Sequence, residues 1–201
     1  MKNAIPNLLL LFRLLLGPTM IFLASKYGNS IRFELVFLIL LGLLSDIFDG
    51  IIARKLGVSS EKMRRLDSQV DLVFWLCVGF CCWILNRELI IQNQFSIALV
   101  FVMEALTYIF SFAKFGKETC THAYLSKFWG ITLFATFVSI IGFGYAGICF
   151  YLSLIVGIIA HFDVYLIILF LPIWTHDVPS CYHAFKIKKG EKITRNKWFN
   201  G

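Results

Sequence analysis

Residues 45–54 read SDIFDGIIAR and directly follow the aliphatic run LVFLILLGLL at 35–44. The run is typical of a membrane-spanning helix, yet two carboxylates, Asp46 and Asp49, stand at its end. A carboxylate at the centre of such a helix costs about 2.5–3.5 kcal/mol on insertion scales, and ionisable residues in spans commonly mark functional sites. This stretch therefore predicts an acidic site at one end of a membrane helix.

The rest of the chain has the composition of an integral membrane protein. Of its 201 residues, 59% are hydrophobic and only 15% are charged, and the mean hydropathy is +0.78, whereas soluble domains are about one quarter charged. The net charge of +7 does not indicate a nucleic-acid partner, because aromatic and basic residues do not interleave as they do on such a binding face. No linker or internal repeat is visible, so we expect one domain over 1–201.

Apolar runs long enough to cross a bilayer, about 20 residues each, predict an all-α integral membrane fold with six transmembrane helices. A split of the last run at His161–Asp163 would make seven and would leave the basic C-terminal segment outside the cell. The expected spans are 8–24, 34–53, 70–85, 95–113, 128–144 and 148–172.

Lys and Arg residues predict the orientation of these spans. Sixteen of the nineteen fall in the segments 1–13, 54–66, 114–127 and 175–201. Because basic residues collect in cytoplasmic loops, we expect both termini, and the acidic site, on the cytoplasmic side. The basic tail, about 175–201, reads as an interfacial segment that lies against anionic lipid.

A second acidic pair, Asp67 and Asp71, follows in LDSQVD and shares one face of the third expected helix. The short connection 54–66 makes the second and third helices antiparallel neighbours, so the two pairs should meet. Four facing carboxylates need counter-charge, either from nearby bases or from hard cations such as Mg²⁺, Mn²⁺ or Ca²⁺, which prefer oxygen ligands. The nearby bases are Arg54, Lys55, Arg64 and Arg65.

The same residues carry a family resemblance. DIFDGIIAR at 46–54 and MRRLDSQVD at 63–71 resemble the signature D-x2-D-G-x2-A-R-x8-G-x3-D-x3-D of the CDP-alcohol phosphatidyltransferases. Seven of the eight fixed residues are present with unbroken spacing. The exception is Met63, which stands where the signature has its second glycine and should narrow the nucleotide site. IPNLLLLFR at 5–13 is similar to the family's opening I-P-N-x-L-T-x-x-R.

The resemblance implies an enzyme of phospholipid biosynthesis that moves a phosphatidyl group from CDP-diacylglycerol to a small alcohol and releases CMP. It implies a site with two Mg²⁺ or Mn²⁺ ions, a homodimer, and a place in the bacterial inner membrane. By resemblance, Asp71 is also the general base. The metal ligands are Asp46, Asp49, Asp67 and Asp71, and the nucleotide-binding residues are Gly50, Ala53 and Arg54.

The acceptor alcohol is predicted less sharply. Chain length and the opening motif are most similar to phosphatidylglycerophosphate synthases, which favours glycerol 3-phosphate; serine, inositol and inositol phosphate are the alternatives. A phosphorylated acceptor needs cations, and we expect these to be Lys114, Arg64 and Arg65.

Three further ionisable residues, Glu104, His161 and Asp163, lie inside expected spans. They either line the acceptor cavity or form polar pairs that pack the helices. An inactive relative of the family is a second functional class. A transporter is a third, although transport predicts polar residues across the whole membrane and often an inverted repeat.

Overall fold

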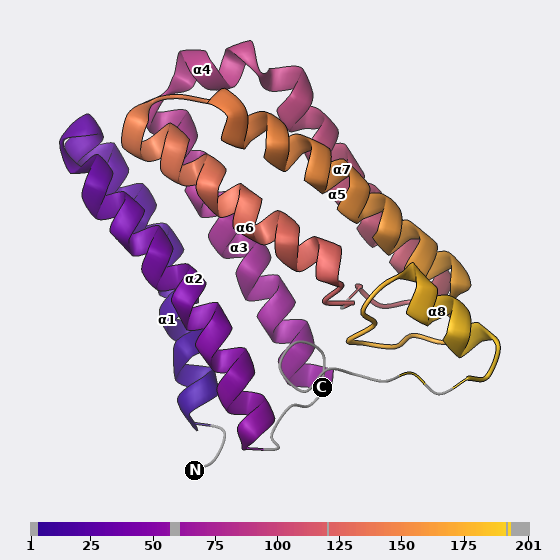
Figure 1. Ribbon diagram of the computed structural model, residues 1–201. Coiled ribbons are helices and arrows are strands. Elements are labelled where there is room, and N and C mark those ends of the chain that lie inside the picture. The colour runs from indigo at the N-terminus through magenta and orange to yellow at the C-terminus, as the bar shows by residue number, and fades with distance from the viewer. Residues whose placement is uncertain (1–3, 57–60, 120, 192, 194–201) are drawn as a thin grey trace. The chain divides into compact units, whose positions relative to one another are not determined.

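The computed structural model describes residues 4–56, 61–119, 121–191 and 193, without the side chains of Ala4 and Arg54. The fold is all-α as predicted, and the described residues contain no strand (Figure 1). The long helices are α1 (Ala4–Tyr27), α2 (Arg32–Lys55), α3 (Glu61–Leu85), α5 (Gln94–Phe115), α6 (Tyr124–Phe137) and α7 (Gly147–Phe170). The shorter elements are η1 (Gly28–Ile31), α4 (Arg87–Gln92), the π-helical η2 (Val138–Gly142) and α8 (Cys181–Lys188).

Long apolar helices make this chain an integral membrane protein. Five stretches among the described residues are long and apolar enough to cross a bilayer. The first of them, Ile5–Ala53, contains both α1 and α2, which the short turn η1 separates. Each expected span falls on a helix, but α3 begins nine residues before the expected span 70–85, and the expected span 128–144 is α6 followed by the π-helical η2. Six crossings and cytoplasmic termini stay predictions.

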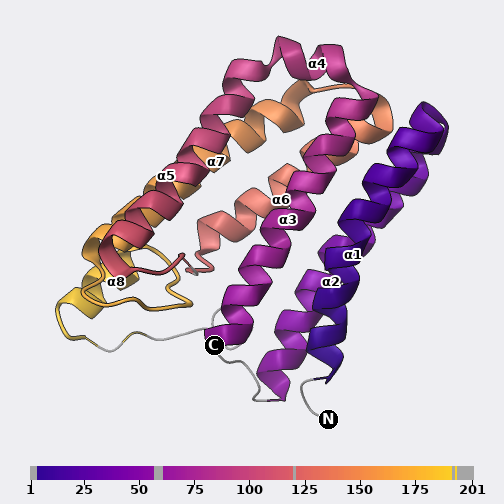
Figure 2. The ribbon, with the colours of Figure 1, turned by 180° about the vertical axis from the view of Figure 1, so that it is seen from behind.

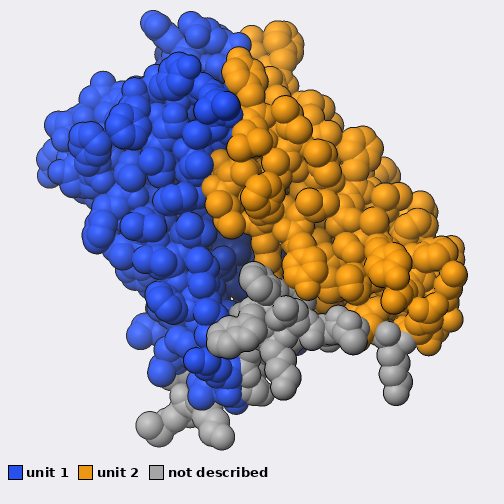
Figure 3. Space-filling view, in the orientation of Figure 1, with its two compact units in different colours: residues 1–93, 134–149 blue, residues 94–133, 150–201 orange. Residues whose placement is uncertain are grey.

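The described chain forms two compact units, coloured separately in Figure 3. The first unit comprises residues 1–93 and 134–149, and the second comprises residues 94–133 and 150–201. Helices α6 and α7 each contribute residues to both units. The single domain over 1–201 stays a prediction.

In the first unit, α1, α2 and α3 lie side by side, as both ribbon views show (Figures 1 and 2). Small residues permit this close approach, as is common between membrane helices. A Cβ added to Gly42 of α2 would lie 2.2 Å from the ring of Phe74 on α3. A Cβ added to Gly17 of α1 would lie 2.9 Å from the sulfur of Cys77. Phe74 is 1% exposed, so this layer has no room for an extra methyl group.

Polar contacts tie together the far ends of the same helices. The guanidinium of Arg32, at the start of α2, donates to the side-chain oxygens of Asn29 and Asn86 and to the Ile141 carbonyl. Asn86 in turn donates to the Ile140 carbonyl at 2.9 Å. The turn η1, the residue that follows α3 and the stretch η2 are thereby bonded to one cation, at the opposite end of α2 from Asp46 and Asp49.

The second unit pairs α5 with α7 (Figures 1 and 2). The Tyr165 hydroxyl donates to the Met103 carbonyl at 2.6 Å, and Glu104 bonds to His161 at 2.9 Å. The amphipathic helix α8 lies in the expected interfacial tail. It packs against the end of α7 through a small apolar core of Ala123, Ile167, Leu171, Val178 and Ala184.

The glycine layer of the first unit gives a stability prediction. Gly42→Ala forces its new methyl group into the Phe74 ring, so it should destabilise the fold by about 1–3 kcal/mol, the usual cost of overpacking. The measurement is thermal unfolding of the purified chain in detergent. Gly79→Ala on α3 is the matched control, because a Cβ there meets nothing within 4 Å. Equal effects from the two substitutions would contradict the packing account.

Candidate active site

The four aspartates lie one helical turn from the tight glycine layer. On α2, Gly42 precedes Asp46 by one turn, and on α3, Asp71 precedes Phe74 by about one turn. Residues three and four apart share a helix face, so the contact that presses α2 against α3 also turns the carboxylates toward each other. The structure thus brings together all four aspartates that the sequence predicted as a cluster.

A cation from α1 lies among these carboxylates. The Arg13 side chain is 1% exposed, and its two terminal nitrogens contact all four aspartates. Nη2 donates to Asp49 at 3.0 Å and to Asp67 at 2.6 Å. Nη1 lies 2.6 Å from Asp46 and 3.1 Å from Asp71. Each nitrogen therefore joins one carboxylate of α2 to one of α3.

Sequence reasoning missed this role of Arg13. In the sequence, Arg13 is one of the basic residues of segment 1–13 that indicate a cytoplasmic end, and the counter-charge is expected from the loop bases or from divalent cations. The structure instead places Arg13 within α1, completely buried. A signal was available, because Arg13 closes the opening motif IPNLLLLFR and interrupts an otherwise apolar helix. Its partners could not be read from the sequence, because they depend on which face of α1 packs against α2 and α3.

The cluster has an inner and an outer pair. The side chains of Asp49 and Asp67 are 3% and 11% exposed, whereas those of Asp46 and Asp71 are 38% and 27% exposed. If all five groups are ionised, four carboxylates and one guanidinium carry a net charge of −3. Removing one partner from a buried ion pair costs about 3–5 kcal/mol, because it leaves the other charge uncompensated, so loss of Arg13 alone should destabilise the first unit.

The donor set of this cluster fits a divalent cation. Asp46, Asp49 and Asp67 each offer a carboxylate oxygen, and these oxygens lie within 4.8 Å of one another. Oxygen ligands without His or Cys suit Mg²⁺, Mn²⁺ or Ca²⁺. The guanidinium matches the same oxygens poorly. Within the described part of the chain, its buried Nε and Nη1 have no partner in hydrogen-bond geometry, despite the short ionic contacts of Nη1.

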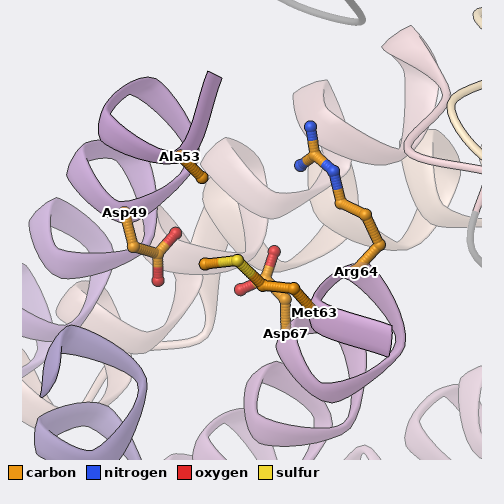
Figure 4. A pocket seen from close by; sticks show the side chains of 6 residues that line it. Asp49, Ala53, Met63, Arg64 and Asp67 are labelled. Atoms are coloured by element: carbon orange, nitrogen blue, oxygen red, sulfur yellow. The ribbon is translucent and has the colours of Figure 1, made fainter. Parts of the chain in front are cut away.

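A small pocket opens beside the inner pair (Figure 4). The space that the centre of a water molecule can occupy in it is about 10 Å³, so the pocket holds about one water. Met63 extends from α3 toward Asp49 on α2. Its thioether stands where the family signature has glycine and takes up space at the pocket; that it narrows a nucleotide site stays a prediction. The lining residues are Asp49, Gly50, Ala53, Met63, Arg64 and Asp67.

The other predicted site residues divide between the pocket and other places. Gly50 and Ala53 line the pocket, and their nucleotide-binding role stays a prediction. Arg64 also lines it, is 6% exposed, and extends away from the two carboxylates in Figure 4. The side chain of Arg54 lies outside the described part of the chain. Arg65 is on α3 outside this pocket lining, and its acceptor role stays a prediction.

Lys114 belongs to the second unit. Its Nζ donates to the carbonyls of Ile168 and Leu169 at 2.8 Å each, near the C-terminal end of α7. A cation at this position satisfies carbonyls that the helix itself leaves open. Lys114 thus has a capping role, and its proposed contact with the acceptor stays a prediction.

The remaining intramembrane ionisable residues form polar pairs within the second unit. His161 bonds through Nδ1 to the Gly157 carbonyl at 2.7 Å and through Nε2 to Glu104. Because a carbonyl can only accept, Nδ1 carries the proton. Asp163 accepts the backbone N–H of Cys181 at 2.9 Å and so caps α8. These contacts favour helix packing over an acceptor cavity.

An acidic cluster at the ends of apolar helices fits a membrane protein that binds a divalent cation, and comparison with known families gives the class of protein. The chain belongs to the CDP-alcohol phosphatidyltransferase family, whose model matches residues 3–170. Arg13, all four aspartates and Met63 lie within the matched part. Comparison with curated proteins finds no match, and neither does comparison with solved structures.

Family membership makes the chain a phosphotransferase of phospholipid synthesis. Its members use CDP-alcohol donors and alcohol acceptors in a membrane, and they typically depend on divalent metal ions. The resemblance seen in the sequence is therefore confirmed at the level of the family, and the enzyme class with it.

The pocket gives a prediction about Met63. Met63→Gly removes the thioether that narrows the pocket, so it should lower the KM for the CDP-linked donor several-fold, with a helix cost of about 0.5–1 kcal/mol. Met63→Leu keeps the bulk and should behave like the unchanged chain. Steady-state kinetics at varied donor concentration measure both. An unchanged KM in Met63→Gly would mean that the thioether does not obstruct the nucleotide.

Proposed function

We propose that this chain transfers the phosphatidyl group of CDP-diacylglycerol to a small alcohol, releases CMP, and uses two Mg²⁺ or Mn²⁺ ions. The observation that carries the proposal is the convergence of Asp46, Asp49, Asp67 and Asp71 from two neighbouring helices. These four carboxylates would hold the ions. When bound, the ions supply positive charge to the diphosphate and to the departing CMP oxygen.

The reaction balances without any other reagent. The acceptor hydroxyl oxygen forms a bond to the phosphorus that carries the diacylglycerol. The bond from that phosphorus to the oxygen bridging it to CMP breaks, and CMP leaves with the electron pair. The hydroxyl proton passes to a carboxylate and then to water.

Asp71 is the best candidate for the carboxylate that takes this proton. The family resemblance assigns this role to Asp71 rather than to Asp46. Both carboxylates of the outer pair, 27% and 38% exposed, are more open to an alcohol than the inner pair. A carboxylate is a weak base near metal ions, and position rather than basicity must therefore carry this role. Gly50 and Ala53 would let the nucleotide approach α2 closely, because neither has a side chain beyond Cβ.

For the acceptor we propose an alcohol that carries a phosphate group, with glycerol 3-phosphate as the first choice. Arg64 supports this choice, because its largely buried side chain lines the same pocket as Asp49 and Asp67 and a guanidinium pairs well with phosphate. Arg65 and Lys114 are further candidates. Serine, inositol and inositol phosphate would use the same chemistry.

We place the reaction on the cytoplasmic face of a bacterial inner membrane. A CDP-linked lipid keeps its acyl chains in the bilayer and its diphosphate at the interface. The distribution of basic residues supports the cytoplasmic side. We also propose a homodimer, on the family resemblance alone.

Removal of the metal tests the core of the proposal. The purified chain in detergent should release CMP from CDP-diacylglycerol only with Mg²⁺ or Mn²⁺ and an alcohol present, and EDTA should abolish turnover. Asp67→Asn should lower the rate by at least about a hundredfold, because even residues that only support metal ligands are worth 10–100-fold. Asp163→Asn is the control, since it lies outside the cluster and an asparagine oxygen can still accept the Cys181 N–H. Full turnover in EDTA would refute the metal centre.

A panel of acceptors tests the second part. CMP release should be fastest with glycerol 3-phosphate, slower with inositol phosphate, and weakest with serine and inositol, because only the first two carry a phosphate for Arg64. Arg64→Gln should raise the KM of the phosphorylated acceptor about tenfold or more, in line with the loss of a charge-assisted pair. A preference for serine or inositol would overturn the choice of acceptor and leave the transfer chemistry standing.

A further inference from the structure

We propose that Arg13 is a positioning residue that neutralises the acidic cluster before metal binds and gives way when a divalent cation enters. This inference rests on the metal centre proposed above. It adds an exchange of one cation for another, in which the guanidinium and the metal compete for the same carboxyl groups.

The competition follows from the shared ligands. Asp46, Asp49 and Asp67, the three residues whose oxygens lie close enough to hold an ion, are all contacts of the guanidinium. Mg²⁺ takes oxygen ligands at about 2.0–2.1 Å, so an ion held by these oxygens would lie within a few ångströms of the nitrogens that now contact them. Two cations this close to each other repel strongly when the site is shielded from bulk water.

The guanidinium is held by charge more than by directional bonds. It has five N–H donors, but its two hydrogen bonds to carboxylates both come from Nη2. Nη1 is close to two carboxylates without hydrogen-bond geometry, and Nε has no partner in the described chain. An arginine with a purely structural role would be expected to use its fork fully. A spherical cation suits carboxylates that converge from several sides.

The metal-free enzyme has a physical need for this residue. Without a cation, four carboxylates at the end of an apolar bundle would repel each other and separate the helices. Arg13 is completely buried and lies on α1, so it supplies positive charge from a third helix and closes the cluster. The site is thereby assembled before the metal and the lipid donor arrive.

The test is Mn²⁺ binding to the full chain in detergent without substrate, measured by electron paramagnetic resonance, together with thermal unfolding with and without Mn²⁺. Arg13→Gln removes the competitor, so its Kd for Mn²⁺ should fall by about tenfold or more, the gain expected when a binding-competent state no longer has to displace another. Without metal the variant should unfold at a lower temperature than the unchanged chain. Saturating Mn²⁺ should recover most of that loss.

Arg13→Lys provides a second variant that keeps the charge. An ammonium is a compact point charge with less reach than the guanidinium fork, so its Kd for Mn²⁺ should lie between those of the unchanged chain and Arg13→Gln. If Arg13→Gln does not fold, a lower Kd for Mn²⁺ in Arg13→Lys than in the unchanged chain still supports the exchange. Arg32→Gln is the matched control, because Arg32 is a bonded arginine at the far end of the same helices. It should lower stability equally with and without Mn²⁺ and leave the Kd unchanged.

The outcomes separate this inference from the proposed function. Weaker or unchanged Mn²⁺ binding in the Arg13 variants, with normal binding by the unchanged chain, overturns the exchange and leaves the metal centre intact. Equal losses of stability with and without Mn²⁺ would show a structural arginine and also overturn it. If the unchanged chain and every variant fail to bind Mn²⁺, the metal centre itself is wrong and the exchange falls with it.

Discussion

Negative charge next to hydrocarbon is the constraint on which the first unit depends. Carboxylates gathered at the end of apolar helices are costly to leave unneutralised. The cluster meets this constraint with a counter-charge from a third helix. Arg13 contacts carboxylates of both α2 and α3, so the electrostatics of the site and the packing of the bundle are one problem.

The apolar layer next to the cluster holds the three helices close enough for the ionic contacts to form. Gly17 and Gly42 allow α1 and α2 to approach α3 so closely that Phe74 and Cys77 fill the space a methyl group would need. The carboxylates follow at one helical turn, where a shift of an ångström would change every ionic contact. Rigid packing in the hydrocarbon region and polar chemistry at its edge are thus set by the same helix faces.

Much of this organisation could be predicted from the sequence, since hydropathy and residue spacing are local properties. The expected span 34–53 corresponds to α2, Arg32–Lys55. The four aspartates that were predicted to cluster all contact the same guanidinium. What the sequence leaves out are contacts between distant segments. The four carboxylates around Arg13 and the two carbonyls at the end of α7 that accept from Lys114 are partners that only the packing reveals. A one-dimensional pattern gives the face of a helix but not the neighbour it meets.

The π-helical stretch Val138–Gly142 has a consequence for how relatives are aligned. A π turn accommodates about one more residue than an α turn, and here it forms the last turn before the helix ends at Phe143. The carbonyls of Ile140 and Ile141 in this stretch accept hydrogen bonds from the side chains of Asn86 and Arg32, respectively. A relative that ends this helix with an ordinary α turn would therefore be one residue shorter here, and a gap-free alignment would pair the wrong residues with the carbonyls that bind Asn86 and Arg32. Evolutionary comparisons of this family should allow a single-residue deletion at that point.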